Sequence, residues 1–71
     1  MPEMVYIPTS VELRELAGMS VVAWAKQNGE DGPRLKVFLS RYGGKRFPLG
    51  NLSGVHTLRM ARKLSDFHCK K

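Results

Sequence analysis

Alternating apolar and polar positions are the clearest pattern in the middle of the chain. In residues 35–40 (LKVFLS) an aliphatic side chain recurs at every second position, which is the period of a half-buried strand. One face of this strand would carry Leu35, Val37 and Leu39, and the other would carry Lys36, Phe38 and Ser40. Residues 19–27 (MSVVAWAKQ) contain valines and a tryptophan and also favour a strand. The turn formers of residues 28–33 (NGEDGP) would join the two strands as a hairpin.

A glycine turn and a third strand are predicted next. Gly43 and Gly44 can adopt the positive φ angles that a tight turn needs. Residues 46–49 then favour a third strand at the sheet edge, because Pro48 cannot donate a ladder hydrogen bond.

Residues 55–68 have the spacing of an amphipathic helix. Met60, Ala61, Leu64 and Phe67 recur at helical intervals, and basic residues occupy the opposite side. We expect the apolar side to pack on the aliphatic face of residues 35–39. The predicted fold class is therefore α+β, with a three-stranded antiparallel sheet packed against one C-terminal helix.

The first 18 residues predict an N-terminal arm or short helix. Residues 5–7 favour a short strand or an extended arm that ends at Pro8. Thr9 and Glu12 fit a capping box, and Gly18 could end the helix that follows, although alternation in residues 11–15 leaves a strand possible. A chain of 71 residues holds a single domain, with residues 1–18 as the arm and residues 19–71 as the sheet-plus-helix part.

The charge is distributed unevenly along the chain. Twelve Lys and Arg residues against six Asp and Glu residues give a net charge of +6. From Gly32 onward the only acidic residue is Asp66. This asymmetry is typical of a nucleic-acid binder. A solvated basic surface, or a patch that meets an acidic protein, would give the same composition.

No arrangement of residues indicates catalysis or metal binding. His56, His68 and Cys69 are too few and too poorly spaced for a structural zinc site, and no nucleophile motif is present. We therefore expect no enzyme activity, no cofactor and no small-molecule substrate. The single cysteine, the lack of a signal peptide and the short apolar run of residues 21–25 favour a cytoplasmic protein without a membrane segment.

Two segments carry a resemblance to a known family. Residues 45–50 (KRFPLG), followed by residues 57–64 (TLRMARKL), resemble the small N-terminal arm-site DNA-binding domain of phage-type tyrosine recombinases. The plant ethylene-response-factor domain is similar in design, and bacterial nucleoid silencers share a weaker likeness. The resemblance implies a free-standing accessory protein or isolated domain of phage or mobile-element type that takes part in DNA recombination. It also implies that the sheet enters a DNA groove and the helix supports it. The segment VVAWA departs from the family pattern because it carries no cation.

The predicted partner is double-stranded DNA, with a second protein subunit possible. The predicted DNA-binding residues are Arg34, Lys36, Phe38, Ser40, Arg41, Lys45 and Arg46. Trp24 is either a core residue or an exposed stacking platform, because a one-residue slip in register inverts its face. The basic side of the last helix is either a second phosphate-binding stripe or a solvated face, and its residues are Arg59, Arg62, Lys63, Lys70 and Lys71.

Two other functions fit the same residues. A small phage-type inhibitor or adaptor could bind a host protein through the basic face, anchored by Phe38, Val21 and Tyr42. RNA binding would use Phe38 and Tyr42 as stacking platforms.

Overall fold

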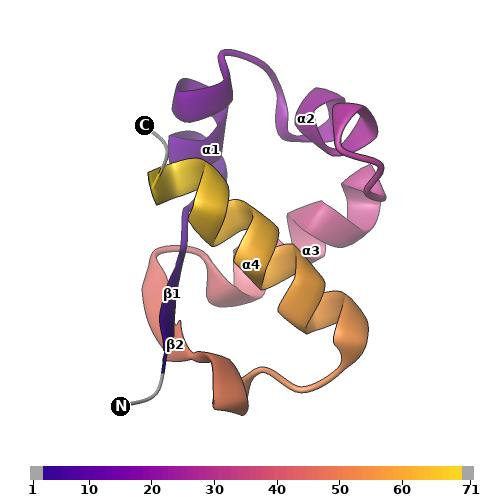
Figure 1. Cartoon of the computed structure of the whole chain (residues 1–71). Helices are drawn as coiled ribbons and strands as arrows, with labels where there is room; N and C mark the ends of the chain where they lie inside the picture. The colour runs from indigo at the N-terminus through magenta and orange to yellow at the C-terminus, as the bar shows by residue number, and fades with distance from the viewer. Residues whose placement is uncertain (1–2, 70–71) are drawn as a thin grey trace.

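The computed structural model describes residues 3–69. The described elements in chain order are β1 (Met4–Ile7), α1 (Ser10–Ala17), α2 (Val21–Gln27), α3 (Gly32–Tyr42), β2 (Lys45–Pro48), the 3-10 helix η1 (Leu49–Asn51) and α4 (Val55–Cys69). Figure 1 shows α4 extending across the molecule, with the strand pair on one side of it and α2 and α3 on the other.

The predicted three-stranded sheet is wrong. Within residues 3–69 the sheet has two strands, β1 and β2, which pair antiparallel with Val5 opposite Phe47 and Tyr6 opposite Arg46. Residues 19–27 and 35–40, both expected as strands, belong to helices α2 and α3. The described residues form a small α+β arrangement of four α-helices, one 3-10 helix and this strand pair, not a sheet backed by one helix.

Helix α3 forms because a helical pattern competes with the alternating one. Leu35, Phe38, Leu39 and Tyr42 follow the i, i+3, i+4, i+7 spacing of a helix face. Asp31 caps the helix by accepting a hydrogen bond from the Arg34 backbone N–H at 3.4 Å, and a proline lies in the first turn. The exposures match the helix, since Phe38 is 7% exposed and Val37 is 59% exposed.

Helix α2 begins at a similar cap. The Ser20 hydroxyl accepts a hydrogen bond from the Ala23 backbone N–H at 3.2 Å. Val21, Trp24 and Ala25 then share the buried side, at the spacing i, i+3, i+4. Trp24 is a core residue. Its ring contacts that of Phe67 edge-on, with the ring centroids 5.7 Å apart. The interpretation of Trp24 as core is confirmed, whereas the strand around it is wrong.

The helix predicted at the C-terminal end is confirmed, and the segment after Thr9 forms the helix of the two alternatives that the sequence left open. Helix α1 begins with the expected capping box, in which Thr9 and Glu12 exchange hydrogen bonds of 3.1 and 3.2 Å. It ends at Gly18, which has a left-handed φ of 69°. Helix α4 covers Val55–Cys69 and buries Met60, Ala61 and Leu64, as the spacing predicts. Lys70 and Lys71, part of the predicted basic stripe, lie outside the described residues.

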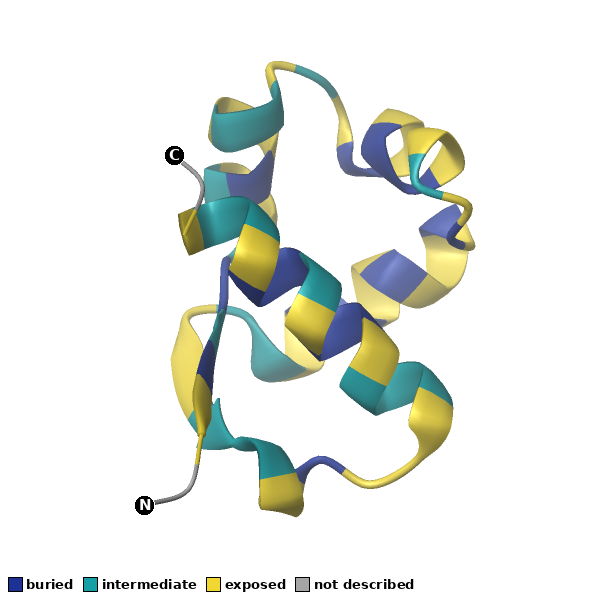
Figure 2. Ribbon diagram, viewed as in Figure 1, coloured by how far each residue is buried: buried dark blue, intermediate teal, exposed yellow. Residues whose placement is uncertain are grey.

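The core lies between α4 and the other elements. Leu35 and Leu39 of α3 share one hydrophobic cluster with Met60 and Leu64 of α4. Figure 2 shows buried positions on α2, α3 and α4 turned toward the interior and exposed positions along the outside. Val37 was expected in this core and instead faces solvent. Within the described residues no helix combines the length and apolar character needed to cross a bilayer.

Candidate nucleic-acid interface

Helices α2 and α3 are joined by a short turn of residues 28–31. Gly29 has a φ of 72°, a left-handed conformation that costs glycine little and other residues more. The backbone N–H of Glu30 donates to the Ala25 carbonyl at 2.7 Å, and the Asn28 side-chain amide donates to the Trp24 carbonyl at 2.9 Å. The end of α2 therefore fixes the path of the turn.

Small residues allow the two helices to approach closely. Ala25 on α2 is fully buried. A Cβ atom added to Gly32, at the start of α3, would lie 3.1 Å from the Cγ1 atom of Val22. Leu35 of α3 is also fully buried and belongs to the same hydrophobic cluster as Ala25. Two helices packed over a short glycine-containing turn form a helix-turn-helix unit.

Helix α4 anchors the turn through a buried carboxylate. The side chain of Glu30 is 1% exposed, and Arg59 and Lys63 each bring a nitrogen to 3.2 Å from its Oε2 atom. Lys63 also donates to the Asn28 carbonyl at 2.7 Å. A buried carboxylate requires such partners, because its desolvation is costly. Arg59 and Lys63 therefore have a structural task beyond forming the basic stripe considered from the sequence.

The outer face of α3 is cationic. Its exposed residues are Pro33, Arg34, Lys36, Val37, Ser40 and Arg41. The helix itself contains no acidic residue, so no charge on α3 offsets the three cations. On a helix this set spans an arc with Val37 near its centre and the cations toward its two sides.

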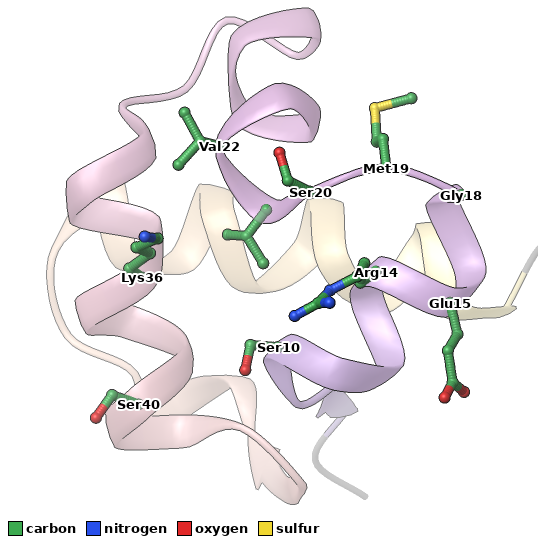
Figure 3. A pocket seen from close by; sticks show the side chains of 10 residues that line it. Ser10, Arg14, Glu15, Gly18, Met19, Ser20, Val22, Lys36 and Ser40 are labelled. Carbon is green, nitrogen blue, oxygen red and sulfur yellow. The ribbon is translucent and has the colours of Figure 1, made fainter.

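A groove lies on the α1 side of this face. We name it the α1–α3 groove; it is lined by Ser10, Arg14, Glu15, Gly18, Met19, Ser20, Val21, Val22, Lys36 and Ser40. Figure 3 shows Lys36 and Ser40 on one wall, with Arg14 reaching into the groove from the other and Glu15 turned away. The groove therefore places Arg14 of α1 opposite the cationic helix.

A second hollow lies on the α4 side. We name it the α3–α4 hollow; it is lined by Pro33, Arg34, Val37, Phe38, Arg41, Tyr42, His56, Thr57 and Met60. No aspartate or glutamate is among these lining residues. Helix α3 is thus a ridge between two depressions.

Five of the seven predicted DNA-binding residues lie on one helix, and four of them are exposed. Arg34, Lys36, Ser40 and Arg41 are all exposed on α3. Phe38 was predicted to face a partner, and it is instead buried in the core against Tyr42, with ring centroids 4.9 Å apart.

The other two predicted residues, Lys45 and Arg46, are exposed on β2, beyond the Gly43-Gly44 turn.

Two residues of the candidate interface, Arg14 and Val37, were not among the DNA-binding residues predicted from the sequence. The signal that would have found Val37 is the Asp31 cap followed by Pro33, which marks a helix start and places residue 37 opposite Leu35 and Leu39. Nothing in the local sequence around Arg14 shows that α1 faces α3 across a groove.

A second polar cluster joins β1 to α1. The Tyr6 hydroxyl donates to the Glu12 carboxylate at 2.6 Å. This hydrogen bond, together with one from the Thr9 backbone, lowers the pKa of Glu12 below its ordinary value. The same bond raises the pKa of Tyr6. Glu12 belongs to the N-terminal capping box of α1, and Tyr6 holds its carboxylate in place, so we interpret the cluster as structural.

Among residues 3–69 no three His, Cys, Asp or Glu side chains come together in a way that could hold a metal ion. Comparison of the chain with protein-family models, with curated proteins and with solved structures gives no significant match. The site therefore has to be interpreted from its own geometry.

Proposed function

We propose that this chain binds double-stranded DNA by placing α3 in the major groove. The observation that carries the proposal is the α2–turn–α3 unit, whose second helix presents three exposed cations and no acid to solvent. The major groove of B-DNA admits an α-helix, and helix-turn-helix proteins place their second helix there. The net charge of +6 would favour encounter with the phosphate backbone.

Three side chains of α3 would read base edges. Lys36 can donate to the O6 and N7 acceptors of guanine, and the Ser40 hydroxyl can donate or accept. Val37 is 59% exposed and would supply apolar contact for a thymine methyl group. Contact with a thymine methyl group would remove the exposed valine side chain from water, which is favourable.

The proposal keeps the DNA partner that was expected from the sequence. The element that enters the DNA groove is now helix α3, where the sequence had predicted the sheet. A two-stranded ribbon can also enter a major groove, but β2 carries two of the seven predicted residues, Lys45 and Arg46, whereas α3 carries four exposed ones. The further proposal of a phage or mobile-element accessory protein in recombination rests only on the local resemblance of residues 45–50 and 57–64.

The two alternative functions, host-protein binding and RNA binding, depended on side chains that the structure packs against other residues. Phe38 and Val21, the expected anchors for a host protein, are 7% and 8% exposed. The expected stacking residue Tyr42 packs between Phe38 and Phe47, with ring separations of 4.9 and 5.4 Å. DNA binding through α3 uses only side chains that are exposed.

Selection followed by titration tests this function. Duplexes with a randomised core about two helical turns long are selected on the protein, and the winner is titrated by fluorescence anisotropy. Affinity should fall steeply between about 50 and 200 mM salt. Lys36→Glu should weaken binding by roughly tenfold or more. Lys26→Glu, the same charge reversal at an exposed position at the end of α2, is the matched control.

A duplex RNA arm separates DNA from RNA. A-form RNA has a deep, narrow major groove that a helix cannot enter, so RNA of the selected sequence should bind more weakly. Failure to bind any duplex at low salt, or equal losses for Lys36→Glu and Lys26→Glu, would overturn the proposal.

A further inference from the structure

We infer that the α3–α4 hollow receives the phosphate backbone of one DNA strand, with Arg34 and Arg41 as its phosphate-binding residues. The inference rests on the proposed function and assigns different roles to different side chains of α3. The two arginines would supply affinity for any duplex, while Lys36, Val37 and Ser40 would supply preference for a sequence.

The shape of the surface is the first argument. Lys36 and Ser40 line the α1–α3 groove, whereas Arg34, Val37 and Arg41 line the α3–α4 hollow. On the helix Val37 lies near the centre of the exposed arc, and the two arginines lie farther toward α4. A helix in the major groove has one phosphate backbone on each side of it. The hollow along the α4 flank of α3 matches one side of this cross-section, and Arg34 and Arg41 lie on that flank.

Charge is the second argument. The α3–α4 hollow brings two exposed arginines together, and no acidic residue lines it. Arginine suits phosphate because its planar group can donate two hydrogen bonds at once. The Thr57 hydroxyl on the α4 wall adds a further possible donor.

The spacing of the arginines is the third argument. Residues seven apart on a helix lie about 10 Å apart along its axis and near the same face. Arg34 and Arg41 can therefore contact different phosphates of one strand. Phe38 and Met60, both core residues at 7% and 1% exposure, form a firm floor between the two helices.

The cations on α4 have other partners. Arg59 and Lys63 bind Glu30, and Arg62 lies 3.2 Å from Glu3. This leaves the arginines of α3 as the cations that line the hollow.

The test compares two double variants on two duplexes. Arg34→Ala/Arg41→Ala removes both guanidinium groups of the hollow, and Arg62→Ala/Lys26→Ala removes two exposed charges outside it. Each protein is titrated with the selected duplex and with a mixed-sequence duplex across a salt series. The hollow variant should lower the slope of log K against log salt by about 2, because each lost phosphate contact contributes about 0.9.

The ratio of the two affinities separates phosphate contacts from base contacts. The hollow variant should weaken binding to both duplexes equally, so its specificity ratio should stay within about threefold of the wild type. Lys36→Ala should reduce that ratio roughly tenfold. Phosphate ethylation interference should show contacts on both strands for the wild type, and the hollow variant should lose those on one strand. Thermal melting of each variant checks that it is folded.

The outcomes are distinct. An unchanged salt slope, or a loss confined to the selected duplex, would overturn the inference and make the arginines base readers or bystanders. A wild-type protein that binds no duplex would overturn the proposed function itself, before any variant is compared.

Discussion

At the residue scale, Gly29 is the position where backbone conformation most directly shapes the candidate site. Its φ of 72° is left-handed, and no atom lies within 4 Å of an added Cβ. Gly29→Ala should therefore destabilise the fold by about 1–2 kcal/mol through backbone strain alone. Gly50 has equally open surroundings without a positive φ, so Gly50→Ala should be neutral or slightly stabilising. Urea unfolding of both variants measures the difference, and equal effects would contradict it.

The Tyr6–Glu12 pair gives stability a pH dependence. Hydrogen bonds lower the pKa of Glu12 in the folded state, so they stabilise the fold above its ordinary pKa and lose this effect as the pH falls and the carboxylate is protonated. Tyr6→Phe should cost about 1 kcal/mol near neutral pH. The difference in the free energy of unfolding between wild type and variant should shrink below about pH 4. Denaturant unfolding across this pH range measures it, and a gap that does not change with pH would contradict the account.

At the element scale, α4 holds the helix-turn-helix unit through Glu30. The carboxylate is 1% exposed, and its partner Lys63 is 38% exposed. A double-mutant cycle with Glu30→Gln and Lys63→Met should give a coupling energy of about 1 kcal/mol or more. Glu3 and Arg62 form the matched control, because that pair has the same 3.2 Å separation with side chains 64% and 57% exposed.

The control cycle, Glu3→Gln with Arg62→Met, should give a coupling energy below about 0.5 kcal/mol. Both cycles are measured by urea unfolding at one ionic strength. Equal coupling for the buried and exposed pairs would show that α4 does not anchor the turn through Glu30.

Elements also differ in how far their sequence predicts them. Helix α4 has a long apolar stripe and was predicted, whereas the Thr9 capping box indicated α1 with a strand left as the alternative. Helices α2 and α3 were missed because Val21, Val22 and Trp24 favour strands locally, and because residues 35–39 fit two periods at once. The Asp31 cap and the burial of Phe38 decide the matter in favour of a helix.

At the scale of the whole molecule, the excess of positive charge could be predicted from the sequence. The positions of the basic side chains in space could not. The sequence indicates a basic second half and names Arg34, Lys36, Ser40 and Arg41. Their position on one ridge between two depressions depends on how α1 and α4 flank α3, which no local pattern contains. Phe38 was misassigned because the alternating pattern of residues 35–40 was read in place of the helical spacing of Leu35, Phe38 and Leu39, which places Phe38 on the buried side.

The central claim is that α3 is the surface that meets DNA. A titration of ¹⁵N-labelled protein with the selected duplex, followed by NMR, tests this most directly because every backbone amide reports at once. The account predicts that the largest shifts occur in residues 32–42 and in the residues lining the two flanking depressions, with the outer face of α4 unaffected. Shifts centred on β2 or on Arg59 and Arg62, with α3 unperturbed, would contradict it.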